Sequence, residues 1–223
     1  MRNPIHKEGT HLILVFALIL AAVNVLCYFL GGRWLFIGTL TVSLLLLFFF
    51  TNFFRSPKRL ALNAGPYDIL APADGKVVVV EPVFEDALFQ DRRIQLSIFM
   101  SVADVHANWY PFEGEVTHYS HQDGRFQAAY LPKSSNENER SSIVIKSAAT
   151  GQEVLVRQIA GAVARRVVTY AYPGKHCRLN EHLGFIKFGS RVDLFLPPES
   201  VEVLVEVGEH VIGNRTVVAR FKH

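Results

Sequence analysis

A glycine–serine pair near the carboxyl end of the chain is the first candidate for chemistry. Gly189 and Ser190 stand directly before the strand-like run Arg191–Leu196, which would hold the serine hydroxyl at the edge of a rigid element. Glycine has no side chain to shield its carbonyl carbon, so the Gly189 carbonyl is open to attack by the neighbouring hydroxyl. Taken alone, the pair would be interpreted as an ordinary turn between two strands.

A histidine and an aspartate could supply the proton chemistry that such an attack requires. His106 lies in Asp104-Val-His-Ala-Asn108, just after the apolar run Ile94–Met100, and imidazole suits proton transfer near neutral pH. Asp74 lies in Ala71-Pro-Ala-Asp-Gly75, where a carboxylate could orient a histidine and stabilise its charged form. The same residues also fit a surface histidine and a simple Asp-Gly turn, and spacing alone does not choose between these readings.

Composition limits the other classes of function. The formal net charge is +3, and the excess positive charge lies beside the apolar N-terminal segment, at Arg2, Lys7, Arg55, Lys58 and Arg59. A nucleic-acid-binding domain would instead carry a basic stripe on its folded part, so no nucleic acid partner is predicted. Cys27 lies in the apolar segment and Cys177 far downstream, so they are not expected to form a disulfide. The nine histidines are scattered without zinc-site spacing, and no metal is predicted.

Two apolar runs of about 20 residues, the length that crosses the hydrocarbon core as a helix, precede these candidates. They cover about 12–30 and 34–54, and Gly31-Gly32-Arg33 between them is typical of a tight turn. A cleaved signal peptide fits less well, because a second full-length run follows the first. We therefore expect a transmembrane helical hairpin over 12–54.

The charges around this hairpin predict its orientation. Lysine and arginine lie outside both spans at the chain ends, and one arginine, Arg33, lies in the turn. The positive-inside rule then puts an N-terminus of residues 1–11 and the downstream domain in the cytoplasm. A juxtamembrane linker over 55–67 would keep that domain close to the membrane. The basic residues of Phe53–Arg59 are typical of an interfacial flank that attracts anionic lipid.

Residues 68–223 are expected to form one catalytic domain that is mostly antiparallel β-sheet. Short β-type runs are separated by glycine and proline, several of them alternate between apolar and polar residues, and long helical patterns are absent after residue 60. The predicted class is α+β, with a barrel-sandwich-like β domain, one or two short helices and an irregular or helical insertion near Asp104–Asn108. The predicted strands are Lys76–Val80, Ile94–Met100, Ile143–Lys146, Val154–Ile159, Val163–Tyr170, Arg191–Leu196, Val201–Val207 and Thr216–Arg220.

Taken together and in this order, these pieces resemble the phosphatidylserine decarboxylases, in particular their short bacterial and archaeal-type branch. The resemblance covers most of residues 53–197, and the shared order makes it specific although each piece alone is weak. The matching pieces are Phe54-Arg-Ser-Pro57 with Arg59, Ala71-Pro-Ala-Asp-Gly75, Phe99-Met-Ser101 with Asp104-Val-His-Ala-Asn108, Asn138-Glu-Arg140, Gly161 with Ala164-Arg-Arg166, and Gly184-Phe-Ile-Lys-Phe-Gly-Ser-Arg-Val192.

The resemblance implies a self-processing enzyme. The Ser190 hydroxyl would attack the Gly189 carbonyl, the peptide would rearrange to an ester, and β-elimination and hydrolysis would separate chain 1–189 from chain 190–223. The second chain would begin with a pyruvoyl group made from Ser190, a covalent cofactor, and the two chains would remain together as a heterodimer. Its ketone would form a Schiff base with the amine of phosphatidylserine and accept electrons as carbon dioxide leaves. A proton returned to the carbanion would then give phosphatidylethanolamine.

The resemblance also implies that Asp74, a histidine and Ser190 drive self-cleavage. Longer members carry two histidines in this segment, three residues apart, whereas this chain has His106 and then Trp109. Either His106 serves both self-cleavage and decarboxylation, or another histidine supplies one of the two roles. The nearest in sequence are His118, His121 and His182.

Two classes of function remain open at this point. The first is a lyase of phospholipid biosynthesis, made as a zymogen and held at the cell inner membrane with its catalytic domain on the cytoplasmic face. Its substrate would be phosphatidylserine or an archaeal-type or otherwise modified serine lipid. The second is a membrane-anchored binding or adaptor module in which Gly189 and Ser190 only form a turn. The enzyme predicts two chains, and the adaptor predicts one intact chain.

Overall fold

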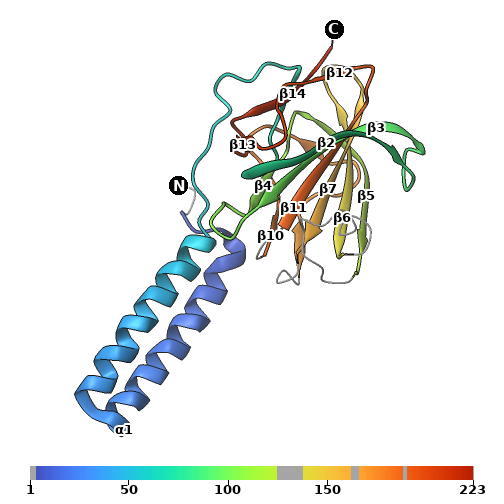
Figure 1. Cartoon of the computed structure of the whole chain (residues 1–223). Coiled ribbons are helices and arrows are strands. Elements are labelled where there is room, and N and C mark those ends of the chain that lie inside the picture. The colour runs from blue at the N-terminus through green and yellow to red at the C-terminus, as the bar shows by residue number, and fades with distance from the viewer. Residues whose placement is uncertain (1–3, 125–137, 162–165, 188–189, 223) are drawn as a thin grey trace. The chain divides into compact units, whose positions relative to one another are not determined.

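The computed structural model describes residues 4–124, 138–161, 166–187 and 190–222 (Figure 1). Its contacts divide the chain into two compact units, Met1–Lys58 and Arg59–His223. Each unit is described by itself below. Gly189 of the predicted cleavage site lies outside the described residues.

The N-terminal unit is built on one long apolar helix, α1 (Lys7–Phe53), whose backbone leaves helical geometry at Gly32. The φ of Gly32 is 65°, in the left-handed region that glycine adopts without strain. The two arms lie beside each other, as Figure 1 shows, and the Phe16 and Phe50 rings are 4.7 Å apart. The interruption falls within the predicted turn at residues 31–33.

Polar side chains join the two arms of α1 within their apolar surroundings. The Asn24 side-chain amide donates to Ser43 Oγ at 2.7 Å, and Thr39 Oγ1 donates to Asn24 Oδ1 at 3.0 Å. Most of the leucine, isoleucine, valine and phenylalanine side chains of α1 are exposed instead. The helix is long and apolar enough to cross a membrane.

The second unit is mostly antiparallel β-sheet, which confirms the predicted class, and its largest sheet is a curled half-barrel of eight strands (Figure 1). In spatial order these strands are β13 (His210–Val211), β2 (Gly75–Glu85), β3 (Asp91–Met100), β11 (Ser190–Leu196), β7 (Glu153–Ala160), β6 (Arg140–Ser147), β5 (Gly114–Gln122) and β9 (His176–Cys177). Two sheets of three strands complete the unit: β1 (Asp68–Leu70), β14 (Val217–Phe221) and β12 (Val201–Val203), and β4 (Ala107–Trp109), β10 (His182–Ile186) and β8 (Val167–Thr169).

One apolar core holds these three sheets together. Leu96, Ile98 and Val192 contribute to it from the large sheet, Phe221 from the sheet of β14, and Leu183 from the sheet of β10. Strand β11 is buried along its whole length, because it lies between β3 and β7 and has both faces covered. The strand that begins at Ser190 is therefore shielded from solvent along its whole length.

The predicted strands are largely present, with three kinds of difference. The clean alternation of Val201–Val207 predicted one strand, but β12 ends at Val203, because the chain turns at Gly208 to pair β13 with β2. No helix lies in the described part of residues 59–222, so the one or two short helices do not appear there, and the insertion near residue 104 is irregular rather than helical. Strands β1, β4, β5, β9, β10 and β13 were not predicted; β5 is dominated by polar residues and most of the others are very short.

Gly184 lies beneath a buried cluster of three polar side chains that joins two sheets. Gln158 on β7 donates to Asn108 Oδ1 at 2.7 Å and accepts from Thr169 Oγ1 at 2.6 Å. In the small sheet, Gly184 pairs with Asn108 on one side and with Thr169 on the other. A Cβ at position 184 would stand 2.7 Å from Gln158 Nε2 and would collide with the Val168 carbonyl oxygen. Only glycine lets β8, β10 and the Gln158 amide approach this closely.

We predict that Gly184→Ala destabilises the second unit by about 1–3 kcal/mol, because neither the Val168 backbone nor the Gln158 amide can move without losing hydrogen bonds. The apparent melting temperature of the purified full chain should then fall by roughly 2–4 °C per kcal/mol. Thermal unfolding followed by circular dichroism measures it.

The matched control is Gly65→Ala, because a Cβ there would meet only Asp68 Oδ2, at 3.6 Å, which is an ordinary contact. Its stability should stay within about 0.5 kcal/mol of the parent chain. Equal melting temperatures for both variants and the parent would contradict the packing around Gly184.

Candidate active site

Ser190 occupies the first position of β11 with its side chain sealed from solvent. It is 0% exposed and pairs with Met100 of β3 on one side and Ala160 of β7 on the other. Side chains alternate along a strand, so Ser190 shares the core-facing side with Val192 and Leu194. Among the described residues, none forms a hydrogen bond with Ser190 Oγ.

Ser190 and Asp74 stand at the start of two strands that flank the end of β3. Ser190 pairs with Met100, the last residue of β3. On the other side, β2 begins at Gly75, directly after Asp74, and runs antiparallel to β3. Since neighbouring strands are about 4.8 Å apart, the backbones of Ser190 and Asp74 are separated by one strand, roughly 10 Å.

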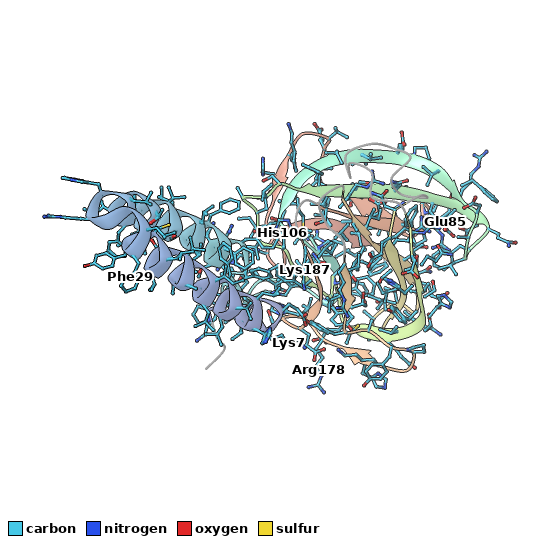
Figure 2. All side chains as sticks on the ribbon, turned by 90° about the horizontal axis from the view of Figure 1, so that it is seen from below. Lys7, Phe29, Glu85, His106, Arg178 and Lys187 are labelled. Carbon is cyan, nitrogen blue, oxygen red and sulfur yellow. The ribbon has the colours of Figure 1, made fainter. Side chains whose placement is uncertain are left out.

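His106 reaches the same end of β3 through a turn. The Asp104 carboxylate closes this turn by accepting from the Ser101 N–H at 2.8 Å and the Ser101 hydroxyl at 2.7 Å. The His106 carbonyl then accepts from the Ile186 N–H at 3.2 Å, so His106 lies beside the strand that leads toward Ser190. Figure 2 shows His106 and Lys187 at one end of the β unit, with Glu85 at the other.

The His106 imidazole is fully buried, and its Nδ1 lies 3.0 Å from the Asp104 carbonyl oxygen. Donation of the Nδ1 proton to that carbonyl places the imidazole lone pair on Nε2. A neutral histidine in this tautomer is the form that a general base requires.

The Asp74 carboxylate is held by an arginine and a backbone amide, where a histidine was expected. Arg59 Nη2 donates to Oδ2 at 2.6 Å, and Arg59 Nη1 donates to Oδ1. The Gly213 N–H also donates to Oδ1, at 2.8 Å. Both charged side chains are nearly buried, 11% exposed for Arg59 and 12% for Asp74. Removing one partner of such a pair typically costs several kcal/mol, about 3–5, because a buried charge is left uncompensated.

Trp109, which stands where longer family members carry a second histidine, is buried between two other site residues. The Arg59 guanidinium lies over its ring at 5.0 Å, and the His182 ring meets it edge-on at 5.3 Å. Gly213 packs so close that a Cβ there would stand 2.8 Å from the indole. The tryptophan therefore supports the arginine that binds Asp74.

The three alternative histidines lie in different places. His182 begins β10, the strand that leads toward Ser190. His118 and His121 lie on β5, three strands from β11 in sheet order. The His121 Nδ1 lies 3.0 Å from Ser141 Oγ, and its Nε2 lies 3.6 Å from carboxylate oxygens of Asp123 and Glu139.

A polar cavity of about 450 Å³ lies on the β7 side of Ser190, although Ser190 itself does not line it. Its wall includes Glu139, whose carbonyl accepts from the N–H of Ala160, the β7 partner of Ser190. It also includes Arg166, whose carbonyl accepts from the Lys187 N–H. Its other lining residues are Tyr119, His121, Asp123, Val167, Val168 and Thr169.

Two other titratable groups of the second unit are held neutral by burial. Burial raises the pKa of the Cys177 thiol to about 11, and the thiol donates to the Gly114 carbonyl at 3.4 Å. Burial also raises the pKa of the Tyr110 phenol far above its ordinary value. Neither group is a base or a nucleophile near neutral pH.

The surroundings of Ser190 fit a group made from the serine itself. A buried hydroxyl without a hydrogen bond costs about 1–3 kcal/mol, and conversion to a pyruvoyl group would remove that hydroxyl. Among the described residues, no cluster of three or more histidine, cysteine, aspartate or glutamate side chains could hold a metal ion.

Sequence reasoning named Ser190, His106 and Asp74, and all three lie around the end of β3. It missed the Arg59–Asp74 pair because position 59 looked like part of a basic membrane flank. It missed the turn-closing role of Asp104, which the spacing of Ser101 and Asp104 could have indicated.

The comparisons with known proteins agree with the family resemblance seen in the sequence. The family model described as phosphatidylserine decarboxylase matches residues 46–219. A phosphatidylserine decarboxylase proenzyme of Parabacteroides distasonis is 52% identical, over 97% of this chain and 98% of its own length. Proenzymes of the same name from Phocaeicola vulgatus and Porphyromonas gingivalis are 48% and 49% identical, again over at least 95% of each chain.

Matches of this extent and identity cover the residues around Ser190, His106 and Asp74 as well as the apolar N-terminal segment. The chain therefore belongs to the phosphatidylserine decarboxylase family of carboxy-lyases.

Proposed function

We propose that this chain converts phosphatidylserine to phosphatidylethanolamine and carbon dioxide, with a pyruvoyl group that it makes from its own Ser190. The observation that carries the proposal is the burial of Ser190 at the first position of β11, with no hydrogen bond to its hydroxyl from the described residues, in a chain of this family. The word proenzyme in the names of the relatives supports a self-cleaved precursor.

Self-cleavage begins when Ser190 Oγ attacks the Gly189 carbonyl carbon, and the C–N bond breaks as the new ester forms. Loss of the Ser190 α-proton then expels the Gly189 carboxylate, which becomes the end of chain 1–189. The enamine that remains takes a proton on its β-carbon and becomes an imine, to which water adds. Ammonia then leaves, so chain 190–223 begins with a ketone. The pairing of Ser190 with Met100 and Ala160 supports this sequence of steps, because it fixes the backbone on the carboxyl side of the bond.

His106 and Asp74 would serve this chemistry from the end of β3. His106, with its lone pair on Nε2, would take a proton from Ser190 during self-cleavage and return one to carbon after carbon dioxide has left. The Asp74 carboxylate would stabilise the positive charge that this histidine carries after it has taken the Ser190 proton. Both groups are buried, which strengthens their electrostatic interaction.

The mature group would supply a ketone that receives the substrate amine and an electron sink for the bond to the departing carboxylate. The polar cavity lined by Glu139 and Arg166 would hold the rest of the lipid head group. The two arms of α1 would cross the membrane as a hairpin, with the catalytic domain of residues 68–223 on the cytoplasmic face, because lysine and arginine flank both arms. Such an anchor keeps the active site near a substrate that stays in the bilayer.

Ser190→Ala should abolish self-cleavage and decarboxylation together, because both need the serine oxygen. The product should be one intact chain of 25.1 kDa that still inserts into membranes. Intact-mass measurement and carbon dioxide release from phosphatidylserine vesicles test this.

The matched control is Ser97→Ala, which removes a buried serine hydroxyl from β3 and should cleave normally. If the parent chain itself stayed intact without a pyruvoyl mass change, the enzyme proposal would fail and a binding or adaptor module would be favoured. Normal cleavage of Ser190→Ala would mean that another serine is the source.

His106→Gln should lower carbon dioxide release per pyruvoyl group by about 10²–10⁴-fold, because the general acid is lost. If His106 serves both steps, self-cleavage should slow as well. Decarboxylation at the parent rate would remove His106 from the catalytic set.

The same substitution at His118, His121 and His182 identifies the processing base. Slow self-cleavage in only one of these variants, with normal cleavage of His106→Gln, would divide the two roles between two histidines. Normal cleavage in all three would leave both roles with His106.

A further inference from the structure

The Arg59 side chain is nearly buried in the second unit, although its neighbours in the sequence suggest a membrane flank. Its guanidinium is 11% exposed and binds both oxygens of Asp74. It also donates to the Gly213 carbonyl at 3.2 Å, and the Gly213 N–H donates back to Asp74. Arg59, Asp74 and Gly213 therefore form a closed ring of hydrogen bonds. A charge that is buried in this way is not available to attract anionic lipid.

The rest of Arg59 is fixed as firmly as its charge. Its carbonyl accepts from the Asn214 side-chain amide at 3.1 Å, and Asn214 is fully buried. The indole of Trp109 lies beneath its guanidinium. An arginine held by its backbone, its plane and its charge loses little further freedom when it binds a carboxylate, so the geometry of the pair is well defined.

The hydrogen bonds of this ring leave one acceptor position of the Asp74 carboxylate open among the described residues. An ionised carboxylate offers about four acceptor positions, two on each oxygen. Oδ1 accepts from Arg59 and from Gly213, whereas Oδ2 accepts only from Arg59 among the described residues. One lone pair of Oδ2 thus remains for another donor, and the bidentate arginine fixes the direction in which it points.

We propose that Arg59 is a positioning residue for self-cleavage, which orients the Asp74 carboxylate so that Oδ2 stabilises the charge of the histidine that has taken the Ser190 proton. This inference rests on the proposed function. It gives Trp109 a role as well, because the indole supports the guanidinium. It also assigns Arg59, the first residue of the second unit, to self-cleavage rather than to a membrane flank.

The test compares self-cleavage rates of the full chain synthesised in the presence of lipid vesicles. Arg59→Gln should cleave about tenfold more slowly or worse, and Arg59→Lys should fall in between, because lysine keeps the charge but not the two parallel hydrogen bonds. Lys58→Gln is the matched control. It removes the same charge from the adjacent, exposed position, and its cleavage rate should not change.

Two further readouts separate positioning from a merely structural role. Once Arg59→Gln has cleaved, its decarboxylation per pyruvoyl group should approach that of the parent, because Asp74 acts in the processing step. Methylguanidinium at millimolar concentration should accelerate cleavage of Arg59→Ala, whereas the same concentration of potassium chloride should not.

The outcomes that overturn the inference are distinct from failure of the proposed function. An uncleaved parent chain would contradict the function itself. With a parent that cleaves, equal rates for Arg59→Gln and the parent would contradict the inference, and so would equal slowing by Lys58→Gln. If limited proteolysis finds Arg59→Gln unfolded, Arg59→Lys and the rescue decide. A folded Arg59→Lys as slow as Arg59→Ala, together with no rescue, would reduce Arg59 to a structural anchor.

Discussion

The pairing of β11 between β3 and β7 is the constraint on which the rest of this unit depends. It fixes Ser190 at the edge of the candidate site, and it lies directly on the carboxyl side of the bond proposed to break. A strand that loses its covalent continuity at one end must be held by other contacts. All seven positions of β11 are buried, and Arg191 and Asp193 form an ion pair on the face opposite Ser190, with Arg191 Nε 2.8 Å from Asp193 Oδ1.

The same logic extends to the whole segment 190–223. Its strands do not form a separate subdomain: β11 pairs with β3 and β7, β13 with β2, and β14 with β1. Segment 190–223 thus contributes strands to two sheets, where they form hydrogen bonds with strands that precede the proposed cleavage site. Both cysteines are free. After the proposed cleavage, sheet pairing and a shared apolar core would therefore hold the two chains together without a disulfide.

What the sequence could predict depends on the range of the interaction involved. Long alternating or apolar runs such as Ile94–Met100 and Arg191–Leu196 can be recognised as strands, because burial on one or both faces of a sheet imposes a local pattern. Short strands such as β4 and β10 carry no such pattern, since three to five residues leave too few repeats. They matter nonetheless, because β4 follows His106 directly and β10 leads toward Ser190. Ordered motifs could locate Ser190, His106 and Asp74, whereas the partner of Asp74 could not be read locally.

Arg59 and Asp74 show why that partner was missed. They are fifteen positions apart, and the contact between them also needs Trp109, Gly213 and Asn214 from two further segments. A basic residue next to an apolar helix has a ready local explanation, and only the closed tertiary structure overrides it. The local context of Ser190 suggests a turn, whereas the structure shows a buried hydroxyl that forms no hydrogen bond with the described residues. A buried hydroxyl without a partner costs about 1–3 kcal/mol, which the pairing of β11 must offset in the precursor. Self-cleavage would transfer that oxygen to the new carboxylate of Gly189, so the hydroxyl would leave the start of β11 while the rest of this strand stays paired with β3 and β7.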